Sequence, residues 1–211
     1  MNSTVRPLDR NLDYNGLISL FKSNPTTFLG YTDSIVESVM MEKIHDLFND
    51  PLFFTLVTVV DEEIIGAFTT KEFEFQPCWT WGYWVHKPGK LTKLWLEDGF
   101  NMIRSINDQL FDEMETRRGL TRFFWSFPQY PDQTGIRTAG SGERWLASNV
   151  GIKYMPRGRN YTYFDDCFIP AGTTPRYLYQ QAIVGNRVWP MDIKIRMGVL
   201  KSITGNDQNV G

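Results

Sequence analysis

Apolar residues recur every three or four positions in several stretches of the chain, and this spacing predicts helices that bury one face. The clearest stretch starts at Ser34, which has the capping-box spacing with Glu37 and so could close the first turn of a helix. The longest stretch contains Gly99, which predicts a kink because glycine weakens the interior of a helix. The predicted helices cover residues 12–21, 34–48 and 91–118, and shorter ones are expected over 141–150 and 176–184.

Between these stretches lie β-branched and aromatic runs that predict strands. The sequence Asp61-Glu62-Glu63 separates two such runs and predicts a hairpin. In the next run, strict alternation would place Trp79, Trp81 and Val85 on one side of the strand and Trp84 on the other. The predicted strands cover residues 4–8, 53–60, 64–75, 78–85, 120–127, 152–155, 161–168 and 192–200.

This order of elements predicts an α/β (α+β) fold, with a central mixed, mostly antiparallel sheet and helices on both faces. We expect a core domain over residues 1–168 and a C-terminal extension over residues 169–211, which packs on the core or on a partner. Apolar residues of the extension, among them Trp189, Ile193 and Ile195, supply surface for either contact.

Composition and charge exclude several functional classes. The 211 residues suit one domain, and 42% hydrophobic with 22% charged residues is ordinary for a globular protein. A formal net charge of -2, without a block of lysine and arginine, argues against nucleic acid as a partner. No stretch is apolar enough for a membrane span or a secretion signal, so no membrane partner and a cytoplasmic location are expected.

Metal chemistry is not expected either. Cys78 and Cys167 have neither the spacing of metal ligands nor that of a disulfide framework, and two histidines are too few for a usual zinc site. The aromatic content is high, at 15%, and has two readings: rings that fill the core between sheet and helices, or rings that stack on a ligand.

The junction between strand 78–85 and the long helix is the stretch with most bearing on function. A strand that runs directly into a helix leaves several backbone N–H groups unpaired and pointing the same way, which suits an anionic ligand. Lys87 and Lys90 add positive charge. The loop is short, however, and Gly89 is its single glycine, so it is poorly suited to wrap a diphosphate.

The element order over residues 4–168 resembles the GNAT superfamily of acetyl-CoA-dependent N-acetyltransferases. Val5-Arg6-Pro7 resembles the I-R-P opening of that family, residues 61–66 resemble its D-G-x-I-V-G hairpin, and residues 149–152 resemble its K-L-G-F step. Residues 86–91 match the position of its diphosphate-binding motif, Q/R-x-x-G-x-G/A. Gly89 agrees with that motif, but His86 and Leu91 depart from it, and the leucine side chain is expected to crowd the phosphate oxygens.

The resemblance implies transfer of an acetyl group from acetyl-CoA to an amine on a small molecule or protein. The residues it places at the cofactor are Trp84, Val85, Lys87, Gly89, Lys90 and Leu91. Glu72 and Glu74 lie where family members carry a base, although both could be solvent-facing, and His86 could transfer a proton or line the loop. Where the family often carries an acidic tyrosine, this chain has Ala147.

A second hypothesis is a non-catalytic module. The chain also loosely resembles aromatic-rich members of this fold from tailed bacteriophages, which implies a role in virion assembly, in the host cytoplasm or in the virion. The C-terminal segment would then contact a second copy or a phage structural partner, and Leu91 with a neighbouring aromatic residue would fill the cofactor space. Arg157 and Arg159 could form an anion clamp or an exposed basic turn.

Overall fold

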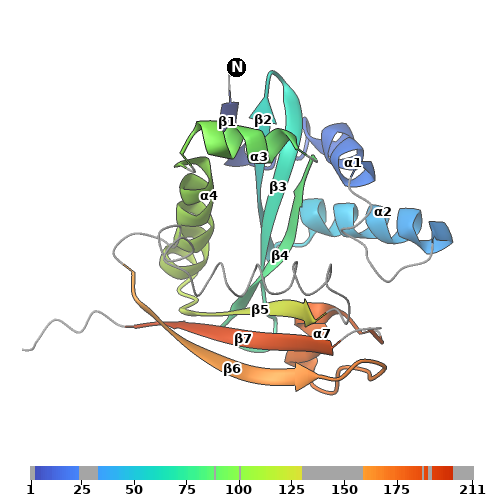
Figure 1. Cartoon of the computed structure of the whole chain (residues 1–211), viewed down its shortest axis with the longest axis vertical. Coiled ribbons are helices and arrows are strands. Elements are labelled where there is room, and N and C mark those ends of the chain that lie inside the picture. Colours follow the sequence, from blue (N-terminus) through green and yellow to red (C-terminus); the bar gives the residue numbers. More distant parts are fainter. Residues whose placement is uncertain are drawn as a thin grey trace, which may run out of the picture.

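In the part of the chain that the structure describes, seven strands form one sheet in the order β1-β2-β3-β4-β5-β7-β6 (Figure 1). The structure, a computed structural model, describes residues 3–23, 33–87, 89–99, 101–129, 159–186, 188–189 and 192–201. The elements are β1 (Ser3–Pro7), α1 (Tyr14–Lys22), α2 (Asp33–Asn49), β2 (Phe53–Val60), β3 (Glu63–Glu72), β4 (Trp79–His86), α3 (Lys90–Glu97), α4 (Asn101–Phe111), the π-helix η2 (Asp112–Arg117), β5 (Arg122–Gln129), β6 (Tyr161–Ile169), α7 (Leu178–Val184) and β7 (Asp192–Leu200).

Most of the sequence predictions agree with these elements. The predicted hairpin is β2 and β3, joined by Asp61 and Glu62 in the left-handed region, at φ 46° and φ 69°. The predicted helix 141–150 and strand 152–155, together with Ala147 and Arg157, lie outside the described residues. All neighbouring strands are antiparallel except β4 and β5, so the predicted mixed, mostly antiparallel sheet is confirmed.

The segment expected as a C-terminal extension contributes a strand to the central sheet. Strand β7 lies between β5 and β6 and pairs with both over its whole length, so residues 192–200 are part of the central sheet. Ile193 and Ile195 are buried against Phe124 of β5 and Val184 of α7. The indole N–H of Trp189 donates to the carbonyl oxygen of Val184 at 3.0 Å. The apolar residues of this segment thus pack on the core.

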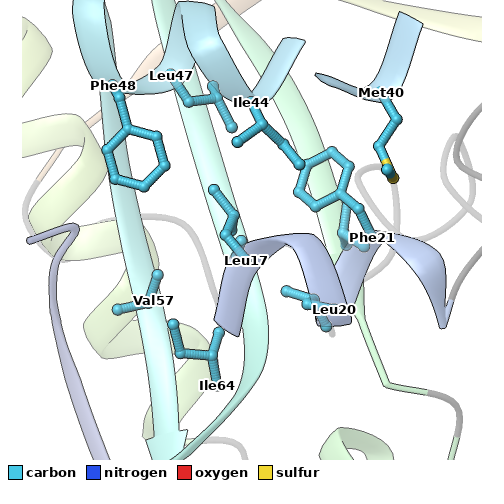
Figure 2. Close-up of a cluster of buried hydrophobic side chains, with 11 residues drawn as sticks. Leu17, Leu20, Phe21, Met40, Ile44, Leu47, Phe48, Val57 and Ile64 are labelled. Carbon is cyan, nitrogen blue, oxygen red and sulfur yellow. The ribbon is translucent and has the colours of Figure 1, made fainter. Parts of the chain in front are cut away.

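Helices α1 and α2 cover one face of strands β2 to β4, and α4 covers the other (Figure 1). On the first face, the apolar sides of α1 and α2 pack against each other and against the sheet, as Figure 2 shows. This cluster contains Leu17, Leu20, Phe21, Met40, Ile44, Leu47, Phe48, Val57, Ile64, Ala67 and Val85. Burial of these side chains against one another holds the two helices on the sheet.

The long helix expected over residues 91–118 is three helical segments. Gly99 adopts φ 61° and ends α3, and a carboxylate oxygen of Asp98 accepts the backbone N–H of Met102 at 2.6 Å, which caps α4. Figure 1 shows α3 lying across the direction of α4. After Phe111 the backbone widens into the π-helix η2. The kink predicted at Gly99 is therefore a full change of direction.

Gly198 of β7 is required by its neighbour. A Cβ at this position would lie 2.3 Å from Cζ of Phe123, whose fully buried ring covers the β7 backbone. Gly198→Ala should therefore lower the free energy of unfolding by about 2 kcal/mol, because the packed ring has no space into which to move.

Gly16→Ala in α1 is the matched control. Its new Cβ would meet the flexible end of Ile64, at 2.9 Å from Cδ1, while alanine favours the helix by up to about 1 kcal/mol, so the net change should be small. Urea denaturation of both variants measures the difference. Equal losses at the two positions would contradict this account of Gly198.

Candidate functional site

Strands β4 and β5 run parallel, and in the described residues they pair at two positions only. Trp79 lies opposite Phe123 and Thr80 opposite Phe124. The hydroxyl of Thr80 donates to the carbonyl oxygen of Phe124 at 2.8 Å. Beyond this point the strands separate toward their C-terminal ends (Figure 1). Among the described residues, no strand pairs with this side of β4 beyond Thr80, and a ligand could bind there.

The middle of β4 also contains a bulge relative to β3. Trp81 lies opposite Thr70 and Trp84 opposite Phe68, so β4 uses two residues where β3 uses one. Such a bulge interrupts the ladder of hydrogen bonds and reverses the alternation of side chains. Trp81 contacts the core beneath α4, whereas Val85 is buried on the opposite face, against α1 and α2. The expectation that Trp79, Trp81 and Val85 share one side was wrong for Val85, because strict alternation assumes an unbroken ladder.

At the end of β4 the chain turns directly into α3. The backbone N–H of Lys87 still pairs with the carbonyl oxygen of Ile65 at 2.9 Å, which fixes the start of the turn. Gly89 then adopts φ 74° as the residue before the helix, a conformation that glycine takes without strain. No side chain caps α3 and its first turn has no acidic residue. The N–H groups of this turn cannot find partners within the helix, and such an arrangement favours an anionic ligand.

The two lysines of the junction share one carboxylate. Glu63, the first residue of β3, accepts from the ammonium group of Lys87 through one oxygen and from that of Lys90 through the other, at 2.7 Å for Lys90. These two hydrogen bonds lower the pKa of the Glu63 carboxyl below its ordinary value. The positive charge predicted at the junction is present, but in this structure it is paired.

Leu91 does not occupy the space in front of the helix. Its side chain is fully buried in the cluster that includes Leu56, Phe68 and Ile106, and its Cδ2 lies over the backbone of Gly66. The expected crowding of phosphate oxygens by this leucine is therefore corrected: the first turn of α3 directs position 91 toward the sheet. Val85 is likewise fully buried, so both residues offer a ligand their backbone and not their side chain.

The structure brings His86 to the junction. It follows the bulge at the end of β4, is half-buried, and packs its ring against that of Trp95 on α3, with 5.9 Å between ring centroids. Trp84 is placed near it, with its backbone opposite Phe68, while the side chain of Trp84 lies outside the described set.

The two candidate carboxylates lie elsewhere. Glu72 is the last residue of β3 and pairs with Trp79, whereas His86 pairs with Gly66, and six residues of strand put roughly 20 Å between these points. The guanidinium of Arg118 holds Glu72 at 3.3 Å. Glu74 is exposed in the turn that follows. The sequence predictions for Glu72 and Glu74 thus fall at the opposite end of β4 from the junction.

A pocket of about 490 Å³ adjoins the junction on the side of α1. Lys87 and Glu63 line it together with Arg6 and Asp13, whose side chains form two hydrogen bonds of 2.6 and 2.7 Å between β1 and α1. The Lys87–Glu63 pair therefore borders open space and is accessible to a ligand.

A second polar cluster, beneath η2, was missed in the sequence. The Glu115 side chain is buried, and one of its oxygens accepts from Arg159 at 2.7 Å and from the Tyr161 hydroxyl at 3.0 Å. Arg159 also lies 3.5 Å from Asp112. Arg159 is thus neither an exposed turn residue nor a free anion clamp. No helical spacing marks Glu115 as buried, because the wider turn of the π-helix directs it inward.

Burial raises the pKa of the Glu115 carboxyl above its ordinary value, although the Tyr161 hydroxyl and the Arg159 guanidinium act in the opposite direction. The same burial, together with the Glu115 charge, raises the pKa of Tyr161. The second oxygen of Glu115 finds no hydrogen-bond partner among the described residues. The cluster therefore ties β6 to the helical layer through a carboxylate that is costly to keep ionised.

The described residues bear on two further classes of site. None of their helices combines the length and the apolar character needed to cross a membrane. No group of three or more histidine, cysteine, aspartate or glutamate side chains is placed there to hold a metal ion.

Arg159→Ala removes the cation that pairs with Glu115. At pH 7 we expect the free energy of unfolding to fall by about 3 kcal/mol, as when one partner of a buried ion pair is lost. Without the guanidinium the pKa of Glu115 in the folded state rises further above its unfolded value. Stability is then lost as pH rises through that folded-state pKa, so the deficit should narrow at pH 5.

Urea denaturation at the two pH values measures this deficit. Arg117→Ala is the control, because Arg117 is 70% exposed and its pair with Glu113 lies at the surface. A deficit for Arg159→Ala that is as large at pH 5 as at pH 7 would contradict the role assigned to Glu115.

The fold is similar to those of several solved acetyltransferases. A ribosomal-protein-S5-alanine acetyltransferase from Vibrio fischeri gives a TM-score of 0.53 at 17% identity, over 96% of this chain and 95% of that chain. A mutant of the spermidine N-acetyltransferase SpeG from Vibrio cholerae gives 0.51 at 13% identity, over 94% of this chain and 93% of that chain. An aminoglycoside 6'-N-acetyltransferase from Enterococcus faecium gives 0.50 at 14% identity, over 92% and 95%.

No protein-family model and no curated protein matches the sequence. At such low identities the structural likeness establishes the fold, while activity has to be argued from the site. The chain therefore has the fold of the GNAT acetyltransferases.

Proposed function

We propose that the protein transfers an acetyl group from acetyl-CoA to an amine. The observation that carries this proposal is the position of the β4–α3 junction, directly beyond the stretch of β4 where, among the described residues, β5 no longer pairs with it. The side of β4 that faces β5 thus leads to helix N–H groups that favour phosphate. The GNAT fold and its similarity to solved N-acetyltransferases add support.

The residues of the junction fit a diphosphate in three respects. Gly89 in its left-handed conformation lets the backbone approach a ligand closely, since nothing lies within 4 Å of where a Cβ would be. The first turn of α3 carries no acidic residue that would repel an anion. The side chain of Leu91 is directed into the core. The departure from the family motif at position 91 therefore does not argue against a phosphate at this turn.

In this proposal the N–H groups at Gly89, Lys90 and Leu91 bind the diphosphate, and the ammonium groups of Lys87 and Lys90 balance its charge. The side of β4 that faces β5 binds the extended arm of acetyl-CoA by backbone hydrogen bonds. A backbone N–H near Trp84 or Val85, just after the bulge, polarises the thioester carbonyl. Acetyl-CoA supplies the activated acyl group that the amine attacks.

In this proposal, proton transfer contributes less to catalysis than the positioning of the reactants does. Glu72 is held by Arg118 and Glu74 lies in an exposed turn, so neither is placed to accept a proton at the junction. His86 is the titratable side chain among the predicted catalytic residues that lies there. Catalysis would rest mainly on holding the two reactants together, which can lower a barrier by several kcal/mol, roughly 7–11 in favourable cases.

The alternative, a non-catalytic phage module in virion assembly, made one structural prediction that can be compared with the described residues. It requires Leu91 to fill the cofactor space, and Leu91 is instead buried beneath α3. Phage origin, a partner at the C-terminal segment and a cytoplasmic location remain predictions from the sequence.

Lys90→Gln tests the binding site. Calorimetric titration should show acetyl-CoA bound by the full chain, and Lys90→Gln should weaken binding by about fivefold, as expected for one charge-assisted phosphate contact that is partly exposed. Lys93→Gln is the matched control: it lies on the same helix, is 72% exposed, and pairs with Glu97.

The proposal fails if millimolar acetyl-CoA produces neither heat nor a shift in the melting temperature of the unaltered protein. Equal weakening by Lys90→Gln and Lys93→Gln would show a general charge effect and would remove the junction from the binding site. With binding established, release of free CoA in the presence of an amine panel reports the transfer itself.

A further inference from the structure

Glu63 is fixed beside the β4–α3 junction by the register of the sheet. It follows the two left-handed turn residues Asp61 and Glu62, and it opens β3, which pairs with β4 up to His86. The bond from the N–H of Lys87 to Ile65 continues this pairing into the junction. The carboxylate of Glu63 is therefore placed there by the backbone of three strands and not by a chance surface contact.

The contact itself uses both carboxylate oxygens. One binds the ammonium group of Lys87 and the other that of Lys90, so a single anion bridges the two cations of the loop. A phosphate group presents the same pattern, with neighbouring oxygens that each accept from one donor. The Glu63 carboxylate thus satisfies the same two donors that the proposed ligand requires.

The Glu63 carboxylate can be replaced at the two lysines by another anion. Glu63 is 43% exposed and Lys90 is 59% exposed, and an ion pair in such positions contributes about 0–1 kcal/mol because water and salt compete for both partners. Lys87 is 17% exposed, so its half of the bridge is less accessible to solvent. A diphosphate carries more charge than a carboxylate and would also bind the helix N–H groups. A diphosphate can therefore displace Glu63. It must first break both lysine contacts of Glu63, and the displaced carboxylate then repels it.

We propose that Glu63 is an internal competitor for the diphosphate-binding site: its carboxylate occupies Lys87 and Lys90 in the free protein and thereby sets the affinity for the acyl donor. This inference rests on the proposed function, because it assigns the anion that the two lysines receive. It makes Glu63 a residue that determines affinity without contact with the reacting atoms. The ligand class is a diphosphate, either inorganic or as part of a coenzyme.

Glu63→Gln is the direct test. The amide keeps the size of the side chain but removes the negative charge, so acetyl-CoA should bind about fivefold more tightly at low salt. Inorganic pyrophosphate, which has the anionic part alone, should show a gain of similar size. Both ligands are titrated calorimetrically into the full chain, after thermal melting has shown that the variant is folded.

Two comparisons separate competition from a general change in charge. Glu62→Gln makes the same change in net charge one residue away, at a carboxylate that forms no ion pair with a described residue; affinity should stay within about twofold, because water screens an exposed charge. In the second comparison Glu63→Gln is combined with Lys87→Gln and Lys90→Gln. The gain should then vanish, since the two lysines for which Glu63 competes are absent.

The outcomes are distinct for the two proposals. If acetyl-CoA binds the unaltered protein and Glu63→Gln equally well, the proposed function stands and the role of Glu63 is overturned. If Glu62→Gln gives the same gain, or if the gain persists without the lysines, the effect is long-range repulsion and the competition is again overturned. If pyrophosphate binding follows the expected pattern while acetyl-CoA never binds, the site is a gated anion site and the acetyltransferase proposal falls.

Discussion

The arrangement of the whole molecule depends on where β4 and β5 stop pairing. Trp79 lies at this point, fully buried, with its ring 4.9 Å from that of Phe111 and 5.0 Å from that of Phe123. Its indole N–H donates to the carbonyl oxygen of Leu120 at 3.2 Å, which fixes the entry to β5. Aromatic rings that pack edge and face in this way are specific in geometry. They lock the strands together at one end, and the twist of the sheet then carries the other ends apart.

The junction beyond β4 is governed by charge more than by shape. Its glycine and its helix N–H groups create a place for an anion, and the chain provides an anion of its own in Glu63. An empty site of this kind would leave two lysines close together without compensation. The carboxylate removes that repulsion in the free protein, at the cost of affinity for the ligand. Stability of the free form and strength of binding are thus opposed at this one side chain.

The sequence pattern predicted the elements well because the helices carry apolar residues at helical spacing, and strands β2 and β3 are β-branched and aromatic runs that are buried over consecutive residues. The hairpin of β2 and β3, helix α2 and strand β7 follow from that pattern alone. Two of the errors share a physical origin, because they lie where backbone geometry departs from the regular repeat. The bulge in β4 moved Val85 to the opposite face, and the wider turn of η2 brought Glu115 inside. Sequence spacing assumes the regular repeat and cannot show these shifts.

The position of β7 bears on how the chain reaches its native state. Strand β6 has β7 as its neighbour in the described sheet, and β5 depends on β7 for all but its short contact with β4. During synthesis both earlier strands emerge before the segment that joins them, since β5 ends at residue 129, β6 ends at residue 169 and β7 begins at residue 192. Until residues 192–200 have been synthesised, the edges of these strands lack β7 and can pair with other chains. Contacts between residues so distant in sequence form slowly, so this half of the sheet is expected to be the late step of folding and the one most in need of a chaperone.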